Sequence, residues 1–265
     1  MSAPATGSLP TTNPCVQETL LDRDLQRQLA WVPVWALVWV AAGLVADRLW
    51  SLVYPHGLNG GPLLVISAGM ILAALVDGWA FKVPNWLTLP LILSGWILGL
   101  CHSLGWPVDS GTGGLGVTLL ATLLGFGLLL PMLIIRGVGE GDVKMQMGFA
   151  AWMGAYFGVG DTTVAAGLDL RLHAFAVVLW AFVCGALFGG VFGLAMILLR
   201  RRFRDNAAMF HAMANDLLLL AQGQMQQMTQ HAEQRRSRWV RLPYGIPLCV
   251  GFLFYLWVVL IVLQN

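Results

Sequence analysis

Charged residues are scarce in this chain. Only 11% of its residues are Asp, Glu, Lys or Arg, whereas 58% are hydrophobic. A soluble domain carries about 25% charged residues, so this composition excludes an ordinary soluble domain. The twelve tryptophans fit a chain with many anchors at the membrane–water interface. The sequence therefore predicts a membrane protein.

Cysteine is also sparse and follows no pattern. The four cysteines are scattered and form no C-x-x-C motif. Three of them lie in apolar surroundings and are interpreted as packing residues. Neither a disulfide framework nor a zinc site is indicated. The polar first 30 residues lack the apolar core of a signal peptide, so we expect no signal sequence there.

Apolar stretches divide the chain into seven expected membrane spans. Each approaches the roughly 20 apolar residues that cross a bilayer, although the fifth is short. The expected spans are residues 30–53, 62–76, 86–104, 113–135, 145–159, 172–199 and 245–263. The predicted fold class is all-α: a polytopic membrane helix bundle of about seven transmembrane helices, with a cytoplasmic N-terminus.

Polar segments complete the expected organisation. Residues 1–29 are predicted to form a cytoplasmic arm, ahead of six transmembrane helices over 30–199 and the last one over 243–265. Segment 200–242 has apolar residues at roughly helical spacing between two arginine clusters. An amphipathic helix on the inner leaflet and a solvated helical hairpin explain this pattern equally well.

The distribution of basic residues predicts the orientation of the spans. With the N-terminus in the cytoplasm, 13 of the 15 basic residues fall in inside segments, and only Arg48 and Arg171 lie outside. Cytoplasmic loops of membrane proteins carry such an excess. Eight of the 13 flank segment 200–242, but the remaining five against two point the same way. Asp77 and Asp142 are then both expected at the cytoplasmic face.

These two aspartates are the candidate catalytic residues, because a carboxylate at a membrane boundary is costly and needs a reason. Asp77 ends an apolar run, and the alternative role for it is a helix-end charge partnered by Lys82. Asp142 precedes the fifth span, and its alternative role is a charge that favours the helix dipole. The sequence leaves both alternatives open.

The stretch around Asp142 favours a functional role. It reads G-V-G-E-G-D-V-K over residues 137–144. Glycines at every second position suggest a backbone that must flex, or one that lies against a substrate strand. Lys144 is interpreted as a basic anchor of the fifth span rather than as a catalytic group.

Two carboxylates held together have a definite chemistry. Like charges in a low-dielectric site cannot both ionise easily, so the pair shares one proton. The ionised member takes a proton from water while the protonated member polarises the scissile carbonyl. This is aspartic peptide hydrolysis, which needs no metal and no cofactor. Neither H-E-x-x-H nor G-x-S-x-G occurs, which argues against metallopeptidase and serine-peptidase chemistry.

Three islands of sequence extend this pattern. The first joins Asp77 to V-P-N-W-L-T-L-P (83–90), the second is G-E-G-D-V-K (139–144), and the third is P-Y-G-I-P (243–247). In this order they resemble the type IV prepilin peptidases, which are bacterial aspartic peptidases with a GxGD motif. The similarity covers roughly residues 62–262.

The resemblance implies removal of the basic leader from prepilins or pseudopilins at the cytoplasmic face of the bacterial inner membrane. The partner would be a precursor with a single N-terminal transmembrane helix, within the lipid bilayer and without nucleic acid. Asp77 and Asp142 would be the catalytic pair. The residues expected in the motif or near the substrate are Pro84, Asn85, Gly139, Glu140, Gly141, Lys144, Pro243 and Gly245.

The chain departs from the larger members of that family. They carry paired C-x-x-C motifs that go with N-methylation of the new terminus, whereas the first 29 residues here contain Cys15 alone. The chain resembles the shorter, peptidase-only type found with tight-adherence (Flp) pili, which puts methyltransferase activity in doubt. Glu140 adds an acid that would attract the leader or raise the pKa of Asp142.

Two other functions fit the sequence less well. A non-catalytic scaffold or assembly component of a pilus or secretion system would not need both aspartates. Peptidases of the presenilin and signal-peptide-peptidase type pair a Tyr-Asp with their GxGD motif and contain Pro-Ala-Leu. This sequence has neither of those signatures.

Overall fold

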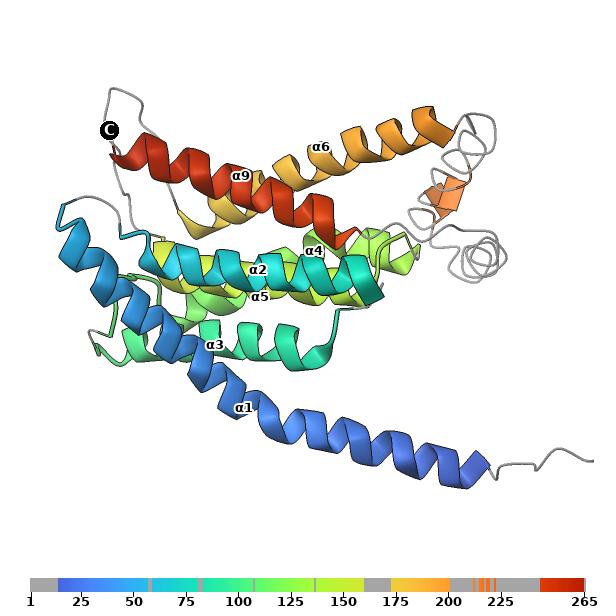
Figure 1. Ribbon diagram of the computed structural model, residues 1–265, viewed down its shortest axis with the longest axis horizontal. Helices are drawn as coiled ribbons and strands as arrows, with labels where there is room; N and C mark the ends of the chain where they lie inside the picture. Colours follow the sequence, from blue (N-terminus) through green and yellow to red (C-terminus); the bar gives the residue numbers. More distant parts are fainter. Residues whose placement is uncertain are drawn as a thin grey trace, which may run out of the picture.

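The computed structural model describes an all-helical protein. It describes residues 14–56, 59–80, 83–106, 108–135, 137–159, 173–200 and 244–264, with 212, 215, 216, 218, 219 and 222 between the last two ranges. Within these residues lie seven helices and no strand. They are α1 (Pro14–Val53), α2 (Gly61–Ala80), α3 (Asn85–Ser103), α4 (Leu115–Ile134), α5 (Glu140–Phe157), α6 (Ala174–Arg200) and α9 (Gly245–Gln264), as Figure 1 shows.

Five of these helices are long and apolar enough to cross a membrane: α2, α3, α4, the part of α1 over Leu29–Val53 and the part of α6 over Ala174–Ala195. The first turn of α5 carries Glu140 and Asp142, and α5 is not among the five. The part of α9 over Gly245–Val258 is a shorter apolar helix. The predicted polytopic helical bundle is confirmed.

The fifth expected span, now α5, is the central helix of the bundle. Fourteen of its 18 residues are buried, mainly by α3 and α4. Small residues permit this close packing, because a Cβ added to Gly95 would lie only 2.7 Å from the Cβ of Ala151. The indole of Trp152 donates hydrogen bonds to the Leu91 carbonyl at 3.2 Å and to Ser94 Oγ at 2.8 Å. Neighbouring helices rather than lipid therefore surround α5.

Helices α6 and α9 form an antiparallel pair against α2 and α5 (Figure 1). The backbones meet at Gly185 and Gly251, where an added Cβ on Gly251 would overlap the Gly185 backbone. Helix packing was predicted for Gly185, Gly189 and Gly193. Gly185 packs on Leu248 and Gly189 lies near Pro247 and Tyr244, but a Cβ on Gly193 would meet nothing within 4 Å.

Helix α1 is continuous from Pro14, so the helix that forms the first span begins well before residue 30. It packs on α2 and α3 near its C-terminal half, and its N-terminal part runs out past the bundle (Figure 1). The sequence left two structures open for segment 200–242. This segment lies almost entirely outside the described residues.

Candidate active site

Asp77 lies in the last turn of α2, and its side chain is only 6% exposed. Its Oδ2 accepts a hydrogen bond of 3.0 Å from the backbone N–H of Gly245, the first residue of α9. The start of α9 is therefore joined directly to Asp77. Lys82, the alternative partner expected from the sequence, lies outside the described residues.

Asp142 lies in the first turn of α5 and is 5% exposed. Its Oδ2 accepts a hydrogen bond of 3.2 Å from the N–H of Gly139, the residue that caps the helix. This bond satisfies one backbone donor at the helix start and fixes the carboxyl group. Asp142 Oδ1 is buried and has no hydrogen-bond partner. The backbone thus holds one oxygen of the Asp142 carboxyl group, while the other oxygen is free to bind another group.

The two aspartates meet beside Gly245. A Cβ added to Gly245 would lie 2.9 Å from Asp77 Oδ2 and 3.2 Å from Asp142 Oδ1. Both carboxyl groups therefore border one small space, at the end of the bundle where α2 ends and α5 and α9 begin (Figure 1). The structure brings together the two residues that the sequence singled out.

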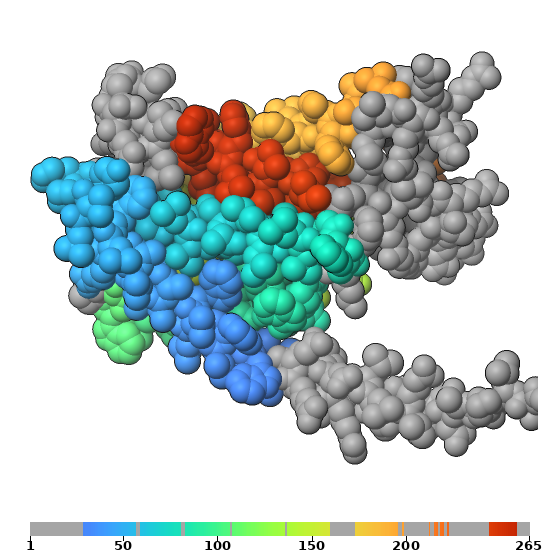
Figure 2. All heavy atoms as spheres, in the orientation of Figure 1, coloured from blue at the N-terminus to red at the C-terminus, as the bar shows by residue number. Residues whose placement is uncertain are grey.

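This space is closed. Both aspartates are nearly buried, and the first residue of α9 covers them. The atoms of α9 lie directly on those of α2 along the face shown in Figure 2. Within the described structure, the start of α9 therefore lies between the two carboxyl groups and the surroundings of the bundle.

The surroundings of Asp142 favour a carboxyl group that keeps its proton near neutral pH. Asp142 precedes the apolar part of α5 and lies outside the five candidate spans. Burial raises its pKa to about 7, assisted by the charge of Asp77 and opposed by the hydrogen bond from Gly139. Removal from water and a nearby like charge both disfavour the ionised form. Such a pair is suited to sharing one proton.

Lys144 and Asn85 lie together at the same end of the bundle as the two aspartates. Lys144 Nζ donates a hydrogen bond of 2.8 Å to Asn85 Oδ1, which ties the first turn of α5 to the start of α3. Pro84 is the residue that caps α3, with an extended backbone (φ −75°, ψ 146°). The lysine interpreted as a basic anchor therefore also connects two of the sequence islands.

Gly141 is required by close packing. A Cβ on Gly141 would lie 2.8 Å from the Cβ and 3.1 Å from the backbone N of Val83, in the connection between α2 and α3. A Cβ on Gly139 would be 3.4 Å from Asp142 Oδ2, an ordinary contact. Positive φ occurs in the described glycines only at Gly105 and Gly158. The alternating glycines Gly137, Gly139 and Gly141 therefore do not adopt positive φ here, and the interpretation that this stretch flexes or lies against a substrate strand stays a prediction.

The third island contributes through its backbone. Gly245 supplies the N–H that binds Asp77, a contact that the sequence did not predict because backbone donors leave no signature. Pro243 lies outside the described residues. Glu140, the first residue of α5, is exposed and therefore accessible to a charged partner.

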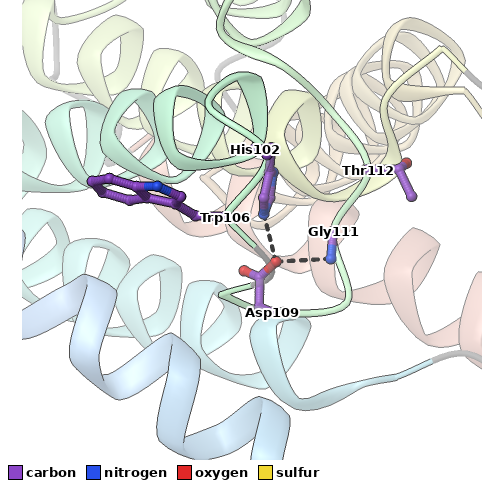
Figure 3. A pocket seen from close by; sticks show the side chains of 6 residues that line it. His102, Trp106, Asp109, Gly111 and Thr112 are labelled. Atoms are coloured by element: carbon purple, nitrogen blue, oxygen red, sulfur yellow. Dashed lines mark hydrogen bonds and ion pairs between the residues drawn. The ribbon is translucent and has the colours of Figure 1, made fainter.

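A second polar cluster lies at the opposite end of the bundle. The His102 ring nitrogens lie 2.7 Å from Asp109 Oδ1 and 3.0 Å from the Gly113 carbonyl oxygen. Asp109 Oδ1 also accepts a hydrogen bond of 2.8 Å from the Gly111 N–H. A shallow pocket opens beside these residues, bordered also by Trp106 (Figure 3). The pocket is remote from Asp77 and Asp142.

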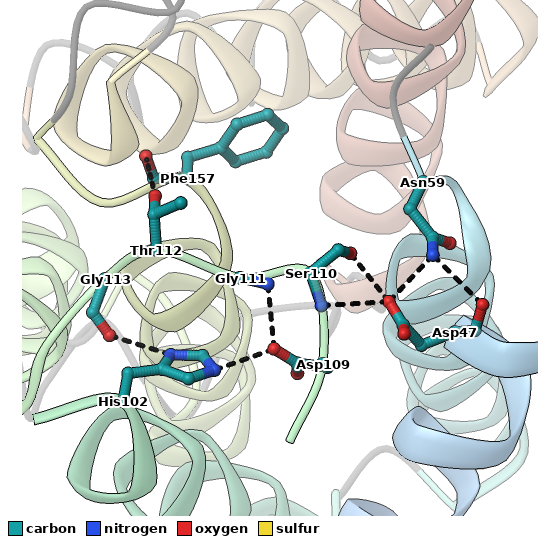
Figure 4. Close-up of polar contacts among 9 residues, drawn as sticks. All are labelled: Asp47, Asn59, His102, Asp109, Ser110, Gly111, Thr112, Gly113 and Phe157. Carbon is teal, nitrogen blue, oxygen red and sulfur yellow. Dashed lines mark hydrogen bonds and ion pairs between the residues drawn. The ribbon is translucent and has the colours of Figure 1, made fainter. Parts of the chain in front are cut away.

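Asp47 anchors the rest of this cluster. Its Oδ1 accepts hydrogen bonds from Asn59 Nδ2 at 2.8 Å and from Ser110 Oγ at 2.6 Å (Figure 4). The hydroxyl of Tyr156 donates to the Asn59 carbonyl. These contacts tie the end of α1 to two loops and to α5, which is a structural role. The cluster was not predicted from the sequence, in which its only signal is an aspartate inside the first apolar run.

The described part of the chain contains no cluster of side chains that could bind a metal ion. There, no group of three or more His, Cys, Asp or Glu side chains is arranged to hold an ion. The polar side chains described at the end of the bundle that holds Asp77 and Asp142 include these two carboxyl groups and one lysine–asparagine pair.

Comparison with known proteins adds one finding. Residues 64–194 match the model of the type IV leader peptidase family. No curated protein and no solved structure matches the chain. The matched segment contains both Asp77 and Asp142, the residues that meet beneath the start of α9. Residues 64–194 of this chain therefore form a segment of the type IV leader peptidase family.

Proposed function

We propose that this protein is an aspartic endopeptidase that cleaves the basic leader from type IV prepilins or pseudopilins. The observation that carries the proposal is the convergence of Asp77 Oδ2 and Asp142 Oδ1 on one point beside Gly245. Membership of the leader peptidase family supports the substrate class. The positive-inside rule supports a cytoplasmic position for this end of the bundle, with the cleavage site, and the family supports a location in the bacterial inner membrane.

The proposed reaction divides the work between the two carboxyl groups. Asp142, whose pKa is raised to about 7, holds the shared proton and donates a hydrogen bond to the scissile carbonyl oxygen. Asp77 is ionised and takes a proton from a water molecule as the water oxygen attacks the carbonyl carbon. The C–N bond then breaks, and the leaving amine receives the proton that Asp77 took. Both aspartates return to their starting states.

The position of the pair suits a precursor that crosses the membrane once. Its apolar helix would lie along the bundle, and its basic leader would extend past the end where Asp77 and Asp142 meet. Glu140 is exposed at this end and offers a negative charge to the leader. Cleavage then needs the start of α9 to separate from Asp77, because the hydrogen bond from Gly245 otherwise occupies the site.

Co-expression with a prepilin precursor tests the proposal. Asp77→Asn and Asp142→Asn should each leave the precursor uncut, because an amide can neither take nor share the proton. Asp47→Asn is the matched control, since Asp47 is also buried but lies in the cluster at the opposite end of the bundle. The Asp47→Asn enzyme should still cleave the precursor.

The readout is the ratio of precursor to mature pilin on a gel, with the amount of inserted enzyme measured in parallel. Normal trimming by either Asp77→Asn or Asp142→Asn would refute the catalytic pair. Strong inhibition by a chelator would refute a mechanism that depends on the two carboxyl groups alone.

A further inference from the structure

Unsatisfied polar atoms concentrate on one face of α5. Four buried side-chain atoms have no hydrogen-bond partner within the described structure. Three of them are Asp142 Oδ1, Gln146 Oε1 and Gln146 Nε2, and the fourth is Trp50 Nε1 in α1. Residues four apart share a helix face, so Gln146 lies one turn beyond Asp142 on the side of the proposed catalytic group.

Gln146 is an unusual residue for this position. Its side chain is completely buried, yet neither its amide N–H₂ nor its carbonyl oxygen is bonded. Buried polar groups almost always have a partner, and one without a partner destabilises the fold. An apolar side chain of the same length would avoid this loss. The free protein therefore gives no structural reason for a glutamine here.

Helix α9 contacts α5 on either side of Gln146 along the helix axis. On one side Gly245 lies against Asp142, and on the other Phe252 stacks on Phe149 with ring centroids 4.4 Å apart. Gln146 lies between these two contacts along α5. Movement of the start of α9, which the proposed reaction already requires, would uncover Asp142 and bring a bound substrate within one helical turn of Gln146. Beyond Gln146 the face becomes apolar.

We infer that Gln146 is a positioning residue that binds the substrate backbone about two residues beyond the scissile bond. One helical turn advances about 5.4 Å, and an extended chain covers this distance in about two residues. The glutamine amide offers both donors and an acceptor, which match the C=O and N–H of a peptide group. This inference rests on the proposed function. With the apolar helix of the precursor lying along the bundle, Gln146 contacts the mature side of the cleavage site.

Backbone recognition by Gln146 has a consequence for specificity. A peptide group presents the same N–H and C=O whatever the side chain, so this contact fixes register without restricting sequence. The side-chain amide of Gln146 would form its hydrogen bonds only when an extended substrate strand lies along α5. Gln146 therefore couples the stability of the site to occupancy by substrate.

The test uses the full-length protein in lipid nanodiscs with a precursor peptide that contains the basic leader, the cleavage site and the start of the apolar helix. Gln146→Met keeps the length of the side chain and removes its hydrogen bonding. We expect kcat/KM to fall about tenfold, as for the loss of a well-made hydrogen bond. Met147→Leu, on another face of α5, is the control and should retain wild-type kcat/KM.

Two further measurements separate positioning from a structural role. Thermal unfolding of Gln146→Met should occur at or above the wild-type temperature, because an unpartnered amide is lost. An ester in place of the peptide bond two residues beyond the cleavage site removes the substrate N–H. It should slow the wild-type enzyme but slow Gln146→Met little further.

The inference is overturned if Gln146→Met cleaves with wild-type kcat/KM, if it unfolds at a lower temperature, or if the ester slows both enzymes equally. These outcomes differ from failure of the proposed function. A wild-type protein that leaves the precursor peptide uncut would overturn that function itself, and the role of Gln146 with it.

Discussion

Asp142 shows how one residue can be costly for the fold and useful for the proposed reaction. Its carboxyl group is buried, with one oxygen bonded to the Gly139 N–H and the other without a partner. The same burial and the nearby Asp77 raise its pKa to about 7. A group that titrates near neutral pH is suited to proton transfer. Burial of a carboxyl group with such a raised pKa makes the stability of the protein depend on pH.

Replacement of Asp142 by Asn should therefore stabilise the protein at high pH. The pKa of Asp142 in the folded protein is raised from 3.8 to about 7, so the unfolded chain loses its proton first and wild-type stability falls as pH rises from about 4 through 7. The amide does not titrate, and it can still accept the hydrogen bond from Gly139. Asp142→Asn should unfold a few degrees above wild type at pH 8 and show little difference at pH 4.

Thermal unfolding in detergent between pH 4 and pH 8 checks this, with the exposed Glu140→Gln as control. Glu140→Gln should follow the wild-type curve. It should also leave the pH profile of cleavage unchanged, because burial and Asp77 account for the raised pKa of Asp142. A shifted profile would show that Glu140 takes part. A pH-independent difference between Asp142→Asn and wild type would contradict the linkage.

The two glycines of the GxGD motif should differ in tolerance. Gly141→Ala would push a Cβ to 2.8 Å from Val83, against backbone as well as side chain, whereas Gly139→Ala would make only an ordinary contact at 3.4 Å. We expect Gly141→Ala to lower stability by about 1–3 kcal/mol through overpacking and to disturb the helical turn that holds Asp142. Gly139→Ala should unfold and cleave nearly as wild type does. Equal effects in both assays would contradict this explanation.

At the scale of elements, α9 is the part that both completes and closes the site. Its first residue binds Asp77, while its middle packs on α6 through Gly251 and Gly185. Its contact with α5 is small in comparison. The α6–α9 pair therefore packs as one unit, which sets where the start of α9 lies relative to the aspartates.

Gly251→Ala should disrupt this unit, because the added Cβ would overlap the Gly185 backbone and force α6 and α9 apart. We expect lower thermal stability and slower cleavage of a prepilin precursor, since the start of α9 would shift from Asp77. Gly190→Ala in α6 is the matched control, because its Cβ would meet nothing within 4 Å. Loss of stability in Gly190→Ala comparable to that in Gly251→Ala would contradict the packing argument.

For the whole molecule, the two ends of the bundle have different tasks. One end carries the aspartates, the Lys144–Asn85 contact and the start of α9. The other carries the hydrogen-bonded cluster around Asp47 and His102, in which loops are tied to helix ends. Orientation in the membrane decides which end meets a cytoplasmic leader.

Cysteine labelling in intact cells tests that orientation. His56 and Glu140 are exposed at opposite ends of the bundle. In a background without native cysteines, a membrane-impermeant thiol reagent should label His56→Cys from outside. It should label Glu140→Cys only after the membrane is opened. The reverse pattern would refute the cytoplasmic position of the site.

Much of the site could be predicted from the sequence because its motifs are local. Asp77 and Asp142 were identified from their positions beside apolar runs, and the helical bundle from composition. The closeness of Val83 to Gly141, the bond from Gly245 to Asp77 and the unpartnered Gln146 could not be predicted. Each depends on which segments lie beside one another, and backbone groups leave no trace in residue types.

The sequence by itself determined that this chain is a membrane protein of many apolar helices with two aspartates at their ends. Hydrophobicity and charge act over short stretches, so they can be read along the chain. Tertiary structure alone decided that α5 is surrounded by protein rather than lipid, and that the start of α9 covers the two carboxyl groups. Burial, pairing and access are properties of neighbours in space, and packing sets them only when the whole bundle has formed.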